Sequence, residues 1–216
     1  MKKYLIIFLA VVTCCYVGCK KDAGNGAPPS ANSYMPVTAG STWTYYFNEQ
    51  GNIDTLTVKM TGATSTQNGR IYYNATTQSK KGGASTLYFT QYNHLFVTRN
   101  LNPYVNATLE LQLYNDTASV NTPWTYLVSD NGKINDVPAR AISTIGPINE
   151  TKSFAGKTYN NVIHVTIEIQ YDLGNGYRTQ FLYDYYLAKG IGILGYNLRA
   201  FNDFVEVEGI LSYDVK

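Results

Sequence analysis

The sequence has few of the side chains that bind metals or form disulfides. It contains three cysteines, all at or before position 19, and two histidines, His94 and His164. Glu168 shares a predicted strand face with His164, but four residues along a strand span about 13 Å, too far for both to bind one ion directly. We therefore expect no disulfide, no metal and no cofactor in the globular part of the chain.

An excess of charge of either sign is also missing. The chain has 17 basic and 15 acidic residues, and without Lys2 and Lys3 at its start the two kinds balance at 15 each. There is no block of basic residues. This composition argues against nucleic-acid binding and against electrostatic attraction to a membrane surface.

The sequence carries no recognisable catalytic signature. A G-x-S-x-G elbow for a serine nucleophile is absent, and so is an acid-rich calcium loop. A carboxylate pair would suffice for glycoside hydrolysis, yet nothing selects one pair among the acids in predicted strands. Glu206 and Glu208 alternate along the last strand, a pattern typical of a solvated face. We expect a non-catalytic protein, with a hydrolase acting on an envelope or extracellular polymer as the alternative. The candidate acids are Glu110, Glu168, Asp184, Glu206 and Glu208.

Residues 1–18 have the composition of a signal peptide. Two lysines precede an apolar run, Tyr4 to Val17, which ends at Gly18 and Cys19 and is followed by polar residues. The run is shorter than the roughly 20 residues of a membrane-spanning helix. It resembles a bacterial lipoprotein signal, in which cleavage before Cys19 leaves a lipid on its thiol. An ordinary cleaved signal or an N-terminal anchor helix is the alternative.

The organisation of the mature chain follows from this signal. Residues 19–33 are rich in Gly, Ala, Pro, Ser and Asn and contain no bulky apolar residue, so we predict a flexible tether. Residues 34–216 form a single β-rich domain. We expect attachment to the outer membrane through lipidated Cys19, in either the periplasmic or the cell-surface leaflet.

Alternating apolar and polar residues recur through the domain and predict strands. The clearest case is Val162 to Tyr171, which the turn DLGNG joins to a second alternating segment, Tyr177 to Leu187. A similar hairpin joins Trp43–Phe47 to Leu56–Met60. We predict an all-β fold, as an antiparallel, strongly curved sheet or a partly open β-barrel, because a sheet with so many strands tends to curl. A β-sandwich is the alternative.

Tyrosine is abundant, with 20 residues, and several predicted strands carry it on both faces. One face fills the core, and rings on the other face are available to stack on a sugar or line an apolar site. From strand alternation we predict Tyr46, Tyr73 and Tyr186 as ligand-binding residues. The expected partner is a glycan, a lipid or another envelope protein.

Three segments carry a family resemblance. They are YMPVTAGSTWTY at 34–45, FAGKTYNNVIHV at 154–165 and YYLAKGIGILGY at 185–196. Together they resemble Bacteroidetes-type outer-membrane lipoproteins of unknown function, with a Y-x-P…G-x-x-W-x-Y opening and an A-x-G-[IV]-G closing hairpin. The resemblance implies an anchored all-β domain and no catalytic residues. Thr55 and Thr117 stand in D-T-apolar triplets similar to sites that such bacteria O-glycosylate. The glycines of the closing hairpin, Gly190, Gly192 and Gly195, are expected to let the chain bend or bulge, or to let a neighbouring ring lie over the backbone.

Overall fold

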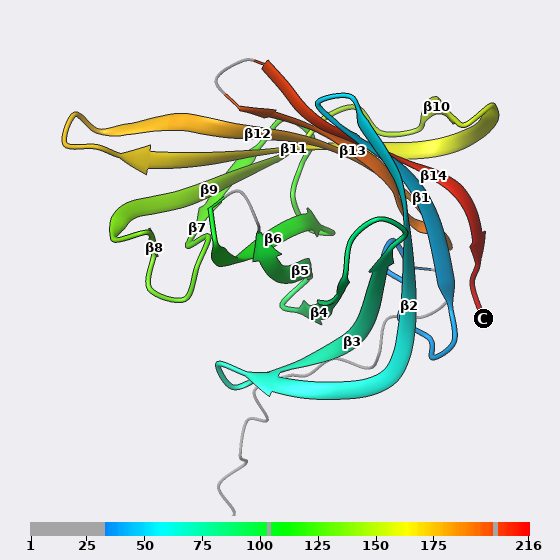
Figure 1. The fold of residues 1–216 in the computed structure, drawn as a ribbon. Helices are drawn as coiled ribbons and strands as arrows, with labels where there is room; N and C mark the ends of the chain where they lie inside the picture. Colours follow the sequence, from blue (N-terminus) through cyan, green and yellow to red (C-terminus); the bar gives the residue numbers. More distant parts are fainter. Residues whose placement is uncertain (1–32, 103–104, 201–202) are drawn as a thin grey trace, which may run out of the picture.

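The computed structural model describes residues 33–102, 105–200 and 203–216 (Figure 1). The predicted signal peptide, Cys19 and the tether as far as residue 32 lie outside the described residues, so they remain predictions. The described residues form strands and turns with no helix. In this part of the chain, accordingly, no helix is long and apolar enough to span a membrane.

The domain is one antiparallel sheet of 14 strands. Its main path runs in the order β6-β5-β4-β3-β2-β1-β14-β13-β12-β11-β9-β7, and β10 and β8 pair with β11 and β9 outside this path. The strands are β1 (Thr42–Glu49), β2 (Asn52–Gln67), β3 (Arg70–Ser79), β4 (Ala84–Tyr92), β5 (Leu95–Asn102), β6 (Ala107–Asn115), β7 (Pro123–Tyr126), β8 (Lys133–Ile134), β9 (Val137–Ile145), β10 (Glu150–Phe154), β11 (Lys157–Asp172), β12 (Tyr177–Ala188), β13 (Gly192–Ala200) and β14 (Asp203–Asp214).

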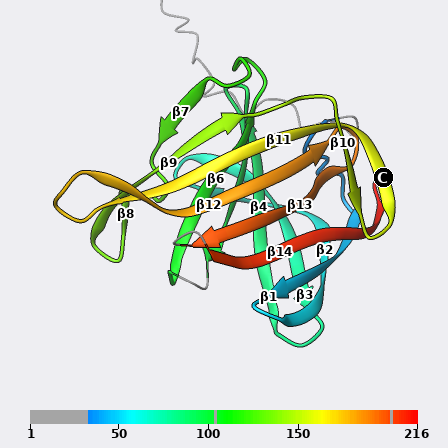
Figure 2. The ribbon, with the colours of Figure 1, turned by 90° about the horizontal axis from the view of Figure 1, so that it is seen from above.

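The sheet rolls up so that its two ends approach each other, as Figure 2 shows from above. β6 forms no strand ladder with β7 or β9, but polar contacts bridge the seam. The backbone N–H of Glu110 donates to the Val128 carbonyl at 2.9 Å, and the Ser143 hydroxyl donates to the Gln112 carbonyl at 2.8 Å. The predicted curved sheet or partly open barrel is therefore confirmed, and the β-sandwich alternative does not describe this fold.

Both predicted hairpins are present. β1 pairs with β2 along its whole length, and β11 pairs with β12 from Val162 opposite Ala188 to Asp172 opposite Tyr177. The alternating apolar residues of β11 point to the concave side of the sheet, where Val165 and Ile167 are fully buried. The core thus lies inside the roll, because the concave faces of opposite strands meet there.

Two glycines allow close packing on β14. Gly195 of β13 has a φ of 156°, and a Cβ at this position would lie 2.2 Å from the Glu208 carbonyl oxygen. On the convex side, a Cβ at Gly209 would lie 2.6 Å from the ring of Tyr46. The predicted bulge is present beside Gly195, where the pairing of β12 with β13 shifts register, and the close neighbour of this glycine is the β14 backbone that carries Glu208.

Candidate functional site

A cavity of about 350 Å³ lies inside the rolled sheet. Trp43 and Glu49, at the two ends of β1, both line it, so the cavity follows the length of this strand. Most of its wall is apolar and includes Leu56, Leu87 and Leu111. The cavity reaches the surface beside β5, where its lining residue Leu101 is 60% exposed.

Three carboxylates lie in the wall of this cavity, that of Glu49 at the end of β1 and two on β14. Glu206 and Glu208 of β14 both line it, and Glu208 is only 8% exposed. The expectation that these acids form a solvated face is therefore wrong. The two acids do alternate along the strand as predicted, but their side chains lie on the inner face of the sheet. Glu208 pairs with Phe47 on β1 and with Tyr196 on β13, and both of these residues point into the roll.

Tyrosines surround the two acids. The Tyr196 hydroxyl donates a hydrogen bond to Glu206. The Tyr185 ring lies with its centroid 5.0 Å from that of Tyr196 and 5.7 Å from that of Tyr183, on which it stacks. Asn102 of β5 donates from its side-chain amide to the Tyr183 hydroxyl at 3.0 Å, which joins two opposite walls of the barrel. The acids and rings together form a defined polar wall within a largely apolar space.

Burial raises the pKa values of the titratable side chains in this polar wall. Burial and, to a smaller extent, the negative charge of neighbouring Glu206 raise the pKa of Glu208 to about 8, while a hydrogen bond from Tyr196 acts in the opposite direction. The pKa values of the Tyr185 and Tyr196 hydroxyls are also raised, mainly by burial. Glu208 therefore carries a proton at neutral pH, and its carboxyl can donate a hydrogen bond or, once ionised, balance a positive charge.

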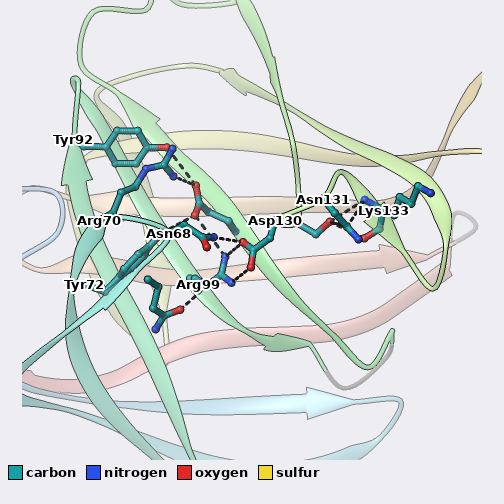
Figure 3. A network of polar contacts seen from close by, with 11 residues as sticks. Asn68, Arg70, Tyr72, Tyr92, Arg99, Asp130, Asn131 and Lys133 are labelled. Carbon is teal, nitrogen blue, oxygen red and sulfur yellow. Dashed lines mark hydrogen bonds and ion pairs between the residues drawn. The ribbon is translucent and has the colours of Figure 1, made fainter. Parts of the chain in front are cut away.

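A second pocket, of about 330 Å³, lies on the other face of β3, β4 and β6 and is strongly polar. Figure 3 shows the network of polar contacts around it. The Arg99 guanidinium binds both carboxylate oxygens of Asp130, at 2.6 and 2.7 Å. Arg70 donates to Glu110 at 2.9 Å, and the Tyr72 hydroxyl donates to the same carboxylate at 2.6 Å.

This polar network connects the segment between β7 and β8 to the sheet. Asp130 belongs to that segment, whereas Arg99 belongs to β5 and Asn68, which also donates to Asp130 at 2.6 Å, follows β2. Each arginine has a carboxylate partner, so the network is already neutral. Its geometry supports a role in holding the fold together, because bidentate pairs fix both position and orientation.

The three predicted binding tyrosines do not line the cavity. Tyr46 and Tyr186 lie half-buried on the convex face, Tyr46 over Gly209 and Tyr186 stacked on His164 with ring centroids 5.0 Å apart. Tyr73 is half-buried on the concave side, opposite Phe89. The structure thus places one of them away from the other two, and their binding role stays a prediction.

Both histidines pair with an aspartate. His94 Nδ1 lies 2.7 Å from the Asp116 carboxylate on an exposed turn. His164 Nε2 lies 3.0 Å from Asp184, which also accepts a hydrogen bond from Arg199 at 2.5 Å. Within the described ranges, no three His, Cys, Asp or Glu side chains gather as ligands for one metal ion.

The comparisons with known proteins identify a similar fold but no family. No family model matches the chain, and no curated protein matches it. A solved structure from Bacteroides fragilis, of a protein regarded as exported and with a YmcC-like fold, has a TM-score of 0.51 at 9% identity, covering 85% of this chain and 99% of that one. A Parabacteroides distasonis protein regarded as a lipoprotein has a TM-score of 0.48 at 11% identity, with the same coverage. The first likeness shows a shared fold.

Proposed function

We propose that the protein is a lipid-anchored lipoprotein of the cell envelope whose barrel interior binds a small, largely apolar molecule without catalysis. The signal that ends at Cys19 supports the anchor, and the fold shared with a Bacteroides fragilis protein regarded as exported agrees with an envelope location. The observation that carries the binding function is the cavity of about 350 Å³. This volume falls within the range of small-molecule sites, roughly 300–1,000 Å³.

Among a glycan, a lipid and an envelope protein, the cavity favours a lipid-like ligand. A glycan needs many polar partners, whereas most of this wall is built from side chains such as Leu56, Leu87 and Leu111. A protein partner needs an exposed surface, and the cavity lies inside the roll. For a glycan or a protein partner, Tyr46, Tyr73 and Tyr186 remain the proposed contacts.

Calorimetric titration with an uncharged alkyl-chain probe, decanol, tests the cavity directly. We expect saturable binding with one molecule per chain. Leu87→Trp adds a large ring to the cavity wall and is expected to weaken binding at least about tenfold, a loss of about 1.4 kcal/mol. Leu173→Trp is the matched control, since Leu173 lies in an exposed turn away from the cavity.

The titration distinguishes binding in the cavity from binding elsewhere and from no binding. Absence of decanol binding to the parent protein would overturn the proposal. Equal weakening in both tryptophan variants would place the bound probe elsewhere. Circular dichroism and melting curves of the two variants show whether each keeps the fold, so a loss of binding in Leu87→Trp can be assigned to the blocked cavity.

The acid pair favours a second function, acid–base catalysis. Burial and the neighbouring charge of Glu206 raise the pKa of Glu208 to about 8. Glycoside hydrolases ordinarily use two carboxyl groups, one protonated and one ionised. A cavity of about 350 Å³ suits a small substrate better than a polymer. Chromogenic glycosides and esters test this function: turnover that Glu208→Gln abolishes would support it, and the binding proposal expects no turnover.

A further inference from the structure

The charged side chains that line the cavity are all acidic. Among the described residues that line the cavity, Glu49, Glu206 and Glu208 carry ionisable carboxylates, and none is a lysine, arginine or histidine. The basic side chains of the described chain lie elsewhere, as in the Arg70–Glu110 and Arg99–Asp130 pairs of the polar network. The described lining of the cavity therefore offers Glu208 no basic side chain as a counter-ion.

Glu208 is the acid with fewer partners. The described residues give it no ion pair, and the Tyr196 hydroxyl near it has a single proton, which Glu208 must share with Glu206. A carboxylate accepts several hydrogen bonds, so a more than nine-tenths buried carboxylate with so few donors is costly in its ionised form. A donor or positive charge brought in by a ligand would offset this cost.

The rings around the acids favour the same kind of ligand. Tyr45, Tyr185 and Tyr196 lie close enough to Glu208 for its charge to raise their pKa values. The faces of aromatic rings attract cations, most strongly at sites shielded from water. An anionic head, such as the carboxylate of a fatty acid, would instead meet Glu206 and Glu208 with like charge.

We propose that the cavity selects an alkyl-chain molecule with a basic nitrogen, whose ammonium head binds between Glu206 and Glu208 while its chain lies along the apolar wall. This inference rests on the proposed binding function of the cavity and adds the charge of the ligand. The ammonium nitrogen would donate hydrogen bonds to the carboxylates, and the neighbouring rings would shield the charge from water.

Three probes with the same chain and different heads test this selection: decylamine, decanol and decanoate, titrated calorimetrically above the pKa of Glu208, which is about 8. Hydrogen bonds to charged groups contribute about 1.5–3 kcal/mol, so we expect the amine to bind about 10- to 100-fold more tightly than the alcohol. The carboxylate is expected to bind more weakly than the alcohol.

Variants of single acids locate the head group. Glu208→Gln is expected to remove most of the preference for the amine, measured as the ratio of decanol to decylamine dissociation constants in the same variant. Glu168→Gln is the matched control, because Glu168 lies on the convex face, where it accepts a hydrogen bond from Thr179 at 2.6 Å. An unchanged amine preference in Glu208→Gln would overturn the assigned position of the head.

The three probes distinguish an error in the charge selection from an error in the binding function. If all three probes bind equally, the cavity binds alkyl chains and the charge selection is overturned. If decanoate binds most tightly, the selection has the opposite sign and is also overturned. If no probe binds, the binding function itself fails.

Proton release gives an independent measurement. At neutral pH Glu208 holds a proton, which an ammonium group would displace, so amine binding should release a proton and decanol binding should not. The titratable groups that face Glu208 are Glu206, Tyr45, Tyr185 and Tyr196, and burial keeps the three tyrosines protonated in this range. Titration in buffers of different ionisation enthalpy counts the released protons, and an equal count for both probes would contradict the inference.

Discussion

The indole N–H of Trp43 donates a hydrogen bond to the Ile191 carbonyl at 2.7 Å, across 148 positions of sequence. The Tyr45 hydroxyl makes the equivalent bond to the Ile193 carbonyl at 2.9 Å. Trp43 and Tyr45 belong to the opening motif and the two isoleucines to the closing hairpin. The two ends of the domain therefore form one unit, and this unit builds the end of the cavity that Trp43 and Pro36 line.

The first prediction concerns this bond. Trp43→Phe removes the indole donor and leaves a small void at a residue that is 5% exposed. We expect a loss of about 1–3 kcal/mol in the free energy of unfolding, measured by urea denaturation. Tyr213→Phe, at an exposed position of β14, is the control and should change stability by less than about 0.5 kcal/mol. Equal stability of both variants would contradict a structural role for the bond.

The local features of the fold could be predicted because they are encoded locally. β11 shows strict alternation from Ile163 to Tyr171 and is followed by a turn sequence, so its hairpin with β12 needs no distant information. The closure of the roll could not be predicted. It depends on contacts such as Ser143 with Gln112, which join residues 31 positions apart through side chains.

The sequence did not predict that Glu206 and Glu208 line a cavity, and the reason is again a contact between distant segments. The segment Val205 to Glu208 alternates perfectly, but alternation is the same whichever face points inward. The deciding fact is that Phe47 lies opposite Glu208, and this requires the pairing of the first and last strands, β1 and β14. A pairing between strands so distant in the sequence leaves no turn signal between them.

The second prediction concerns the polar network. Asp130→Asn leaves the buried Arg99 guanidinium without its bidentate partner, and we expect a loss of about 1–3 kcal/mol at neutral pH. The estimate is moderate because the Asp130 side chain is half exposed and water screens the pair. Asp214→Asn is the matched control, since its pair with Lys216 is exposed and should contribute less than about 0.5 kcal/mol.

The pH dependence of this pair has a definite sign. Hydrogen bonds from Arg99 lower the pKa of Asp130 in the folded state. The stabilisation is therefore complete above the unfolded pKa of about 3.9 and is lost as the pH falls through the lower, folded value. The stability difference between the parent and Asp130→Asn should shrink on acidification, and a constant difference would refute the ion pair as its source.

The third prediction concerns the tyrosines identified by strand alternation. Tyr186 contacts Phe154, with ring centroids 5.8 Å apart, and lies under the ammonium of Lys152 at 5.0 Å. If Tyr46, Tyr73 and Tyr186 serve a glycan or protein partner, their alanine variants should lose that binding with little change in melting temperature. A loss of roughly 3–5 kcal/mol in all three would show that they are core residues. Decanol binding should stay unchanged in each, because none lines the cavity.

The fourth prediction concerns the anchor. Cys19→Ala removes the thiol that the lipoprotein signal would lipidate, and we expect the variant to leave the membrane fraction. Cys15→Ala is the matched control, because a cysteine within the apolar run should not affect the attachment of the lipid. Cell fractionation followed by mass measurement of the mature protein tests both variants. A Cys19→Ala protein that stays as firmly bound as the parent would show that the anchor is not this lipid.

The fifth prediction concerns the buried acid of the cavity. Burial raises the pKa of Glu208 to about 8 in the folded state, whereas an unfolded glutamate titrates near pH 4.3. Between these two values the folded state holds one more proton than the unfolded state, so stability falls as the pH rises. The slope is at most about 1.4 kcal/mol per pH unit, and the effect ends above the folded pKa.

Glu208→Gln isolates this contribution, because the amide keeps the shape of the protonated acid and does not ionise. We expect the variant and the parent to have similar stability near pH 4 and the variant to gain on the parent by a few kcal/mol as the pH rises to about 8. Urea denaturation across this range measures the difference, with Glu168→Gln on the convex face as the control. Parallel stability curves for the parent and Glu208→Gln would mean that Glu208 is ionised in the folded protein, with its charge already balanced within the cavity.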